Sequence, residues 1–238
     1  MKLWVIIQCG VILAALTACL IAMSTTTNSG LKDISTVSEF QQINAEMIKY
    51  SSGEIIESDM IKYLKSTISA DCLSLHSPRQ VIVVTPNERI KQYYGSFMQE
   101  VIVKDVIEGD YSIIDKKINI AAIGGFDITD GTITMLSSYG NNIMLPGNDY
   151  LVFCEITEIS DYMEIPLYRA MPSMLSWLNL NSDYSKSIES DSDALYSEYI
   201  NSEFLGCTQD ALNAALKAKL EVIKEYLGDD YDYLVQSE

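Results

Sequence analysis

The chain has 238 residues, of which 33 are acidic and 16 are basic, so its formal net charge at pH 7 is −17. A surface this negative repels phosphate backbones and anionic lipid head groups, which argues against nucleic-acid binding. The acidic residues are spread along the chain and do not gather at ligand spacing. We therefore interpret them as a source of solubility, with attraction for cations or basic partners as the alternative.

Residues 1–23 predict a segment that targets the chain to a membrane. The run from Leu3 to Met23 has no charged side chain, and a helix of this length is about 31 Å long, close to the thickness of the hydrocarbon core. Residues 16–19 (LTAC) resemble the lipobox of bacterial lipoproteins, which implies cleavage and lipidation at Cys19. An uncleaved signal anchor is the alternative. In both cases we expect a tethered domain on the extracytoplasmic face of the cell membrane, because Lys2 favours a cytoplasmic amino terminus.

A polar linker over residues 24–36 is expected to lead into one extracytoplasmic α+β domain, residues 37–238. A capping box at residues 38–41, followed by apolar residues at helical spacing up to Ile48, predicts a first helix. A second helix is predicted to start at Ser58. Its apolar face consists of Ile61, Leu64 and Ile68.

The carboxyl-terminal part of the chain predicts a long amphipathic helix over residues 208–227. Thr208 is suited to cap it, Asp210 lies in its first turn, and Gly228 follows its end. We expect its leucine stripe to pack on the rest of the domain, with a groove for a partner helix as the alternative. The stripe consists of Leu212, Leu216, Leu220, Ile223 and Leu227.

Between these helical regions the pattern changes to short β-rich runs. Asp130-Gly131 between two alternating runs is typical of a two-residue hairpin, because both central residues must adopt positive φ. Pro86-Asn87 is expected to end the first strand. Residues 162–178 are expected to add a further strand to the sheet. The predicted strands are 80–85, 97–107, 117–123, 126–129, 132–135 and 150–157.

Several short strands with regularly spaced turns favour a small antiparallel barrel, with a core over residues 79–157. The run of Val101, Val103, Val106-Ile107 and Gly109 is followed by Ile118, Ile120 and Gly124-Gly125, and then by Met144, Pro146-Gly147 and residues 150–153 (YLVF). This pattern resembles the OB-like barrel of uncharacterised membrane-anchored proteins from Gram-positive bacteria, and more distantly the netrin-like modules. The resemblance covers residues 80–157 and implies a fold only.

The cysteines do not predict a disulfide framework. Cys9 and Cys19 lie in the targeting segment, which leaves Cys72, Cys154 and Cys207, an odd number at wide spacing. We expect three buried thiols, with one disulfide as the alternative.

No motif of a known catalytic chemistry is present in the sequence. His76 is the single histidine, and there is no nucleophile elbow, phosphate loop or His-Glu-x-x-His motif. The segment from Asp127 to Gly131 lacks the repeated oxygen ligands of a calcium loop. The acidic segment 179–193 is interpreted as a solvated loop, with cation binding as the alternative; its acids are Asp183, Glu189, Asp191 and Asp193. We expect no catalytic residue, metal or cofactor.

Two classes of function remain. The first is a membrane-tethered, non-catalytic binding module whose tyrosine-rich faces contact an envelope protein, a peptide or a glycan. The second is a cell-envelope hydrolase that uses paired carboxylates; a pocket gathering two or more acids of raised pKa would favour it. The tyrosines concerned are Tyr93, Tyr94, Tyr139, Tyr162 and Tyr168.

Overall fold

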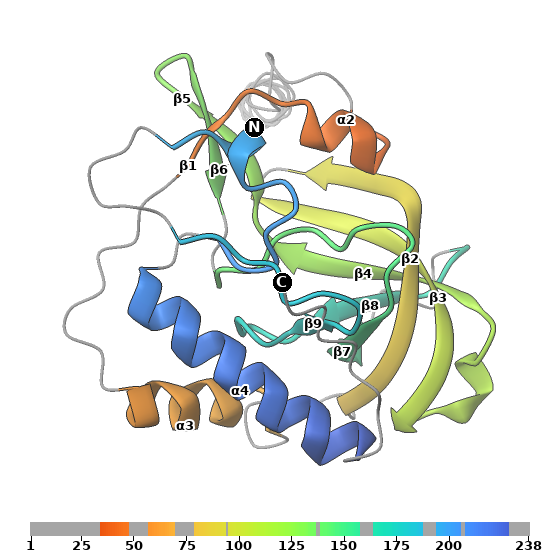
Figure 1. Ribbon diagram of the computed structural model, residues 1–238. Coiled ribbons are helices and arrows are strands. Elements are labelled where there is room, and N and C mark those ends of the chain that lie inside the picture. The colour runs from red at the N-terminus through yellow and green to blue at the C-terminus, as the bar shows by residue number, and fades with distance from the viewer. Residues whose placement is uncertain are drawn as a thin grey trace, which may run out of the picture. The chain divides into compact units, whose positions relative to one another are not determined.

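Five strands close into a barrel in the computed structural model (Figure 1). Their order is β2-β3-β4-β8-β7, and β7 pairs back onto β2. Neighbouring strands are antiparallel except β4 and β8, which run parallel. A short strand β9 (Trp177–Asn179) pairs with the first half of β7. The barrel strands are β2 (Arg79–Tyr93), β3 (Ser96–Glu108), β4 (Lys117–Ile123), β7 (Tyr150–Ile156) and β8 (Leu167–Ala170).

The structure describes residues 34–47, 57–69, 79–93, 95–136, 139–157, 164–187, 194–205 and 208–228. The predicted targeting segment, residues 1–23, and most of the predicted linker lie outside these ranges. In the described part of the chain no helix combines the length and the apolar character needed to cross a membrane.

The predicted α+β class and the β-barrel are confirmed. The predicted range 79–157 contains four of the five barrel strands, and β8 lies beyond it. The expectation of a further strand in residues 162–178 is confirmed, since β8 lies there and joins the sheet.

The predicted strand end at Pro86-Asn87 is wrong, because β2 continues through it as a bulge. The pairing of β2 with β3 slips between Pro86 and Ile90. Proline has no N–H for the ladder and is therefore tolerated at such a bulge. The side chain of Asn87 stabilises it by donating to Oε1 of Glu100 at 2.6 Å and accepting from the backbone N–H of Arg89 at 2.8 Å.

A second, smaller sheet has the order β1-β6-β5. Its strands are β1 (Glu46–Met47), β5 (Gly125–Thr129) and β6 (Thr132–Leu136). The predicted hairpin is confirmed, since Asp130 and Gly131 have φ of 51° and 83°. Gln92 at the end of β2 joins the two sheets, because its amide accepts from the N–H of Phe126 at 3.3 Å and donates to the Phe126 carbonyl at 3.4 Å.

The first predicted helix is much shorter than expected. Helix α2 (Val37–Gln41) begins after Thr36, whose side chain accepts from the N–H of Glu39, so the N-cap lies two residues earlier than predicted. The sequence predicted that this helix continues towards Ile48. For the described residues, which end here at Met47, that prediction is wrong, because Met47 pairs with Met135 of β6 in the small sheet. Pairing in a sheet here overrides the helical spacing of the apolar residues.

An aromatic cluster fills the space between α2, the barrel and the small sheet. The ring of Phe40 from α2 lies 4.4 Å from that of Phe126 in β5 and 6.1 Å from that of Phe97 in β3. Tyr196 of the 3₁₀ turn Tyr196–Glu198 closes the cluster at 5.4 Å from Phe126. Centroid separations of this size are typical of favourable aromatic pairs.

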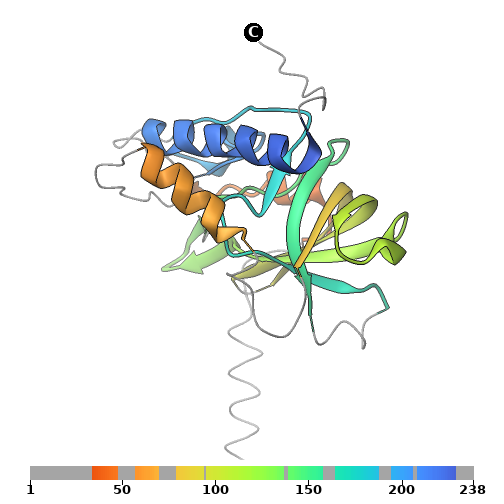
Figure 2. The same cartoon turned by 90° about the horizontal axis from the view of Figure 1, so that it is seen from below.

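Helices α3 (Glu57–Thr67) and α4 (Gln209–Leu227) run side by side against the outside of the barrel (Figures 1 and 2). Ile61 and Leu64 of α3 share a buried cluster with Val81 of β2 and Phe153 of β7. Both predicted helices are therefore present. Exposed ion pairs, such as Lys65–Glu221 at 3.2 Å, join their outer sides.

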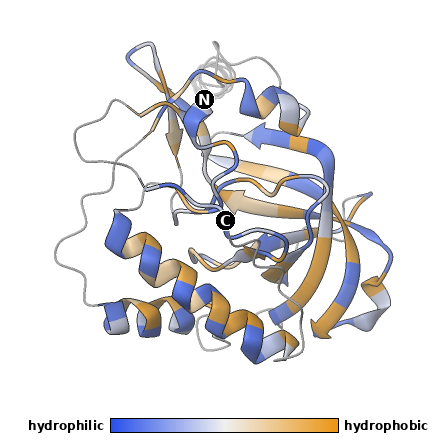
Figure 3. Cartoon of the chain, in the orientation of Figure 1, coloured by the Kyte–Doolittle hydropathy of each residue, from blue (hydrophilic) through white to orange (hydrophobic). Residues whose placement is uncertain are grey.

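The predicted leucine stripe of α4 packs on the buried cluster at four of its five positions, and Leu220 is the exception; the four are Leu212, Leu216, Ile223 and Leu227. Leu212 and Ile223 are buried, but Leu220 is 46% exposed and the neighbouring Lys219 is completely buried. The closely packed side is also rich in alanine, which lets the helix approach the barrel; Figure 3 shows hydrophobic and hydrophilic segments alternating along α4. The alanines concerned are Ala211, Ala214, Ala215 and Ala218.

Candidate ligand-binding site

A pocket of about 520 Å³ lies where the parallel strands β4 and β8 end. Residues 121–123 of β4 and the adjacent segment from Arg169 to Pro172 both line it. Because β4 and β8 are parallel and adjacent, their carboxyl ends meet at the same end of the barrel. The strand topology itself therefore creates the pocket. Ser96, at the start of β3, borders it as well.

The pocket lining is mainly apolar. Trp177 is held in place because its indole N–H donates to the carbonyl of Asn142 at 2.9 Å, and its ring lies 6.1 Å from that of Phe97. The polar side chain of Asn141 donates to the carbonyl of Met174 at 2.7 Å. The apolar lining residues are Ala121, Ala122, Ile123, Tyr139, Ala170, Met171, Pro172 and Trp177.

One buried carboxylate, that of Glu155, faces this pocket. Glu155 in β7 is paired with Arg169 in β8 in the sheet register, so the two side chains lie on the same face. Its Oε1 forms an ion pair with the guanidinium of Arg169, while the exposed fractions of the two side chains are 6% and 58%. The other oxygen, Oε2, is buried and has no hydrogen-bond partner among the residues that the structure describes.

An unsatisfied buried acceptor is costly. Leaving one without a partner costs about 1–3 kcal/mol, and buried polar groups in folded proteins normally have partners. Oε2 of Glu155 is therefore the most unusual polar atom of the pocket, and a hydrogen-bond donor from a ligand would satisfy it.

The predicted tyrosine faces are only partly assembled. Tyr139 lines the pocket and is 39% exposed, and Tyr93 is 43% exposed at the end of β2. Tyr168 was expected on a binding face, but it is buried in β8, so the prediction is wrong for this residue. Tyr94 and Tyr162 lie outside the described residues.

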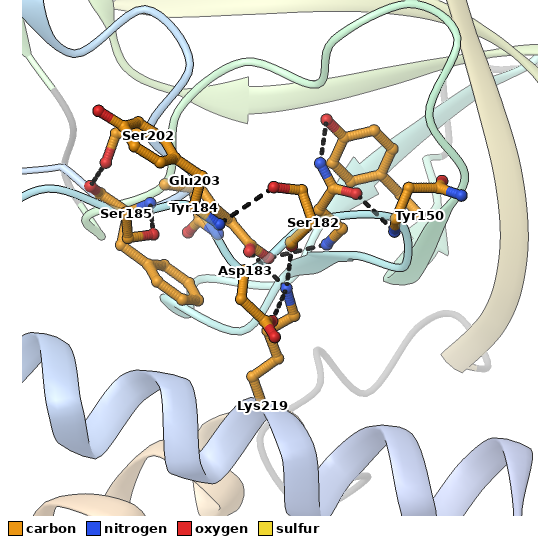
Figure 4. A network of polar contacts seen from close by, with 12 residues as sticks. Tyr150, Ser182, Asp183, Tyr184, Ser185, Ser202, Glu203 and Lys219 are labelled. Atoms are coloured by element: carbon orange, nitrogen blue, oxygen red, sulfur yellow. Dashed lines mark hydrogen bonds and ion pairs between the residues drawn. The ribbon is translucent and has the colours of Figure 1, made fainter. Parts of the chain in front are cut away.

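A second polar group of interest is buried beneath α4 (Figure 4). Lys219 is fully buried, and its ammonium nitrogen lies 2.6 Å from Oε2 of Glu203 and 3.1 Å from Oδ1 of Asp183. It also donates to the carbonyl of Ser182 at 2.7 Å. Asp183 is one of the acids in segment 179–193 for which cation binding was the alternative. It thus pairs with the ammonium of a lysine of the protein itself.

Burial raises the pKa of Glu203 to about 7, although the ammonium of Lys219 opposes this shift. The remaining oxygen of Glu203 accepts from the N–H of Asn179 at 2.7 Å, and Tyr150 accepts from the Asn179 amide at 3.3 Å. Neither Glu203 nor Lys219 lines the pocket. We therefore interpret these buried polar contacts as structural: they hold α4, through Lys219, against the segments that carry Asp183 and Glu203 next to β9.

The remaining sequence candidates are placed as follows. Cys154 is buried in β7, as expected, and burial raises the pKa of its thiol. Cys9, Cys19, Cys72, Cys207 and His76 lie outside the described ranges. Within those ranges no three histidine, cysteine, aspartate or glutamate side chains gather as metal ligands do.

Sequence reasoning did not select Glu155 or Arg169. The available signal was a charged residue inside each of two short, otherwise mostly apolar strands. The two residues are 14 positions apart in the chain, and only the pairing of β7 with β8 brings them together.

Comparisons with protein-family models, with curated proteins and with solved structures found no match to this chain.

Proposed function

We propose that this chain is a membrane-tethered binding module that acts on the extracytoplasmic face of the cell membrane and holds its ligand in the pocket at the carboxyl ends of β4 and β8. The observation that carries the proposal is the pocket of about 520 Å³, which combines an apolar lining with one buried, half-satisfied carboxylate. Pockets of this size, with a few convergent polar groups, are typical of small-ligand sites.

The strand order supports an OB-like assignment for the barrel. Numbering the barrel strands by chain order gives the sequence 1-2-3-5-4 around the barrel, closed between 1 and 4, with 3 and 5 parallel. A five-stranded Greek-key barrel is the OB description, and such barrels bind ligands over strands 2 and 3 and the adjoining loops. The pocket uses the start of β3 and the end of β4, which are strands 2 and 3 in that count. This support is an analogy of fold.

The hydrolase alternative requires two acids facing one pocket. Among the described residues that line the pocket, Glu155 is the only carboxylate. Glu203, whose pKa is raised, lies in the buried connection beneath α4 and does not line it. We therefore favour binding over hydrolysis.

The proposal is tested by titrating the full-length chain in lipid nanodiscs with 4-phenylbutanol, an uncharged aromatic compound, and subtracting the signal of empty nanodiscs. We expect saturable binding that Ala121→Trp abolishes, because the new side chain would occupy the pocket. Thr132→Trp, an exposed change on the β6 hairpin, serves as the matched control and should bind as the natural chain does. His76→Ala should also bind normally. Binding that survives Ala121→Trp would place the ligand elsewhere and refute the proposal.

A further inference from the structure

The side chains of Glu155 and Arg169 offer a ligand two complementary groups side by side. Glu155 has a free, buried acceptor in Oε2, since only Oε1 is bound by Arg169. The guanidinium of Arg169 has five N–H donors, and its side chain is 58% exposed. A donor and an acceptor on one ligand can therefore be recognised at the same point of the pocket.

The charges of this pair restrict the chemistry of the ligand. Glu155 and Arg169 carry opposite charges, so a ligand with a single net charge would leave one charge uncompensated in an apolar pocket. A ligand with an ammonium and a carboxylate in close proximity adds no net charge and gives Glu155 and Arg169 each a further partner of opposite charge. An α-amino acid has these groups on one carbon atom, which matches two protein groups that already touch one another.

The remaining lining selects the side chain of such a ligand. Beyond the charged pair the lining is mainly apolar and includes Met171, Pro172, Trp177, Ala121 and Ala122. A ligand covered with hydroxyl groups would find few polar partners there, whereas an apolar or aromatic side chain would be desolvated favourably.

Oε2 is buried, so a ligand that binds it requires a local shift of the side chains around it. Arg169 has room for such a shift, because more than half of its side chain is in solvent. After such a shift a ligand ammonium would donate to Oε2, and the guanidinium would turn part of its N–H set towards a ligand carboxylate.

We infer that the pocket binds a free apolar α-amino acid as the zwitterion, with its ammonium on Glu155 and its carboxylate on Arg169. This inference rests on the proposed function, since it assigns a ligand class to the same pocket.

Four compounds test the inference on the full-length chain in nanodiscs by isothermal titration: phenylalanine, N-acetylphenylalanine, phenylalaninamide and N-acetylphenylalaninamide. The acetyl group removes the ammonium and the amide removes the carboxylate. We expect phenylalanine to bind at least tenfold more tightly than each of the other three. Equal affinity of the doubly blocked compound would overturn the zwitterion inference, yet it would leave the pocket a site for apolar ligands. Absence of binding by all four would likewise overturn it, while the 4-phenylbutanol experiment judges the pocket separately.

Two variants assign the two contacts. Glu155→Gln should reduce the preference for phenylalanine over N-acetylphenylalanine to less than threefold, and Arg169→Gln should do the same for phenylalanine over phenylalaninamide. The matched control is Glu108→Gln, which changes another Arg–Glu pair of the barrel, that with Arg79, away from the pocket. It should retain both preferences. If Glu155→Gln keeps the same preference for phenylalanine over N-acetylphenylalanine as the control Glu108→Gln, the ammonium does not bind Glu155 and the assignment is wrong.

Discussion

The ammonium nitrogen of Lys219 lies 2.6 Å from a carboxylate oxygen of Glu203, and the two side chains are 0% and 3% exposed. Asp183 lies on the same ammonium at 3.1 Å, so two acids from the segments around β9 converge on one cation of α4. A buried ion pair of this kind contributes little net stability compared with an apolar pair, but the loss of one partner leaves an uncompensated buried charge.

Lys219→Met is therefore expected to destabilise the protein strongly, by about 3–5 kcal/mol. The control on the same helix is Lys217→Met, since the Lys217–Glu57 pair at 2.7 Å is more than half exposed at both side chains and should matter little. Urea unfolding followed by circular dichroism measures both variants. Equal midpoints for the two variants would contradict the structural role of Lys219.

Glu203 should make stability depend on pH. Its pKa is about 7 in the folded protein against an ordinary value of 4.5, so between these values the folded state binds a proton that the unfolded state releases. The associated stability is present in full below about pH 4.5 and is lost as the pH rises through 7. We expect the melting temperature to fall from pH 5 to pH 8.

The groups that face Glu203 are Lys219, Asp183 and the N–H of Asn179, and the variant Glu203→Gln removes the titration among them. Its melting temperature should change less over this range than that of the natural chain. Burial opposes ionisation of Glu100, but hydrogen bonds from Lys117 and Asn87 hold its pKa below 4.5. Glu100 therefore affects stability only at a more acidic pH than Glu203 does. Parallel melting curves for Glu203→Gln and the natural chain would exclude Glu203 as the source.

Gly131→Val should destabilise the β5–β6 hairpin. Gly131 has φ of 83°, and a Cβ added there would meet no heavy atom within 4 Å, so only the backbone conformation opposes substitution. A β-branched residue at positive φ costs about 1–3 kcal/mol. Gly131→Asn is the control, because asparagine tolerates this region. Thermal melts of both variants should separate them, and coincident melts would argue against a conformational origin.

Leu212→Ala and Leu220→Ala test which face of α4 is buried. Leu212 is 2% exposed and its truncation should cost about 2–5 kcal/mol. Leu220 is 46% exposed, and its truncation should change stability by less than about 0.5 kcal/mol. Denaturant unfolding of the two variants decides the matter. A larger effect at Leu220 would contradict the exposed position of that residue.

The tether prediction concerns residues 1–23. The full chain should be recovered in the membrane fraction of the cell, whereas a chain beginning at Ser24 should be recovered in the soluble fraction. Cys19→Ala separates the two anchors: loss of lipid labelling identifies a lipoprotein, and unchanged retention without labelling identifies a signal anchor. Recovery of the full chain in the soluble fraction would refute the tether.

The parts of the fold that the sequence predicted well are those decided by local chemistry. Strand β4 has the predicted bounds, Lys117–Ile123, because alternation ends there at glycine. The hairpin at Asp130 follows from the requirement for positive φ. Predictions failed where distant contacts compete with local preference, as at Pro86, where the bulge is stabilised by Glu100 of another strand.

The candidate site could be predicted only in part, for the same reason. Tyr139 was selected as an exposed aromatic residue and does line the pocket. Glu155 and Arg169 become neighbours only through the pairing of β7 with β8, and nothing in a single sequence specifies that register. Lys219 was missed because a lysine among leucines is normally taken as the solvent side of a helix.

The length of β2 has a consequence for how the protein unfolds. Val81, near its start, belongs to the buried cluster beneath α3 and α4, whereas Gln92, near its end, holds β5 of the small sheet. One continuous strand of 15 residues is therefore shared by both halves of the described structure. Local opening of either half would remove partners from the same strand. We therefore expect the helical layer and the small sheet to unfold as one cooperative unit, in which the most protected amide hydrogens exchange together.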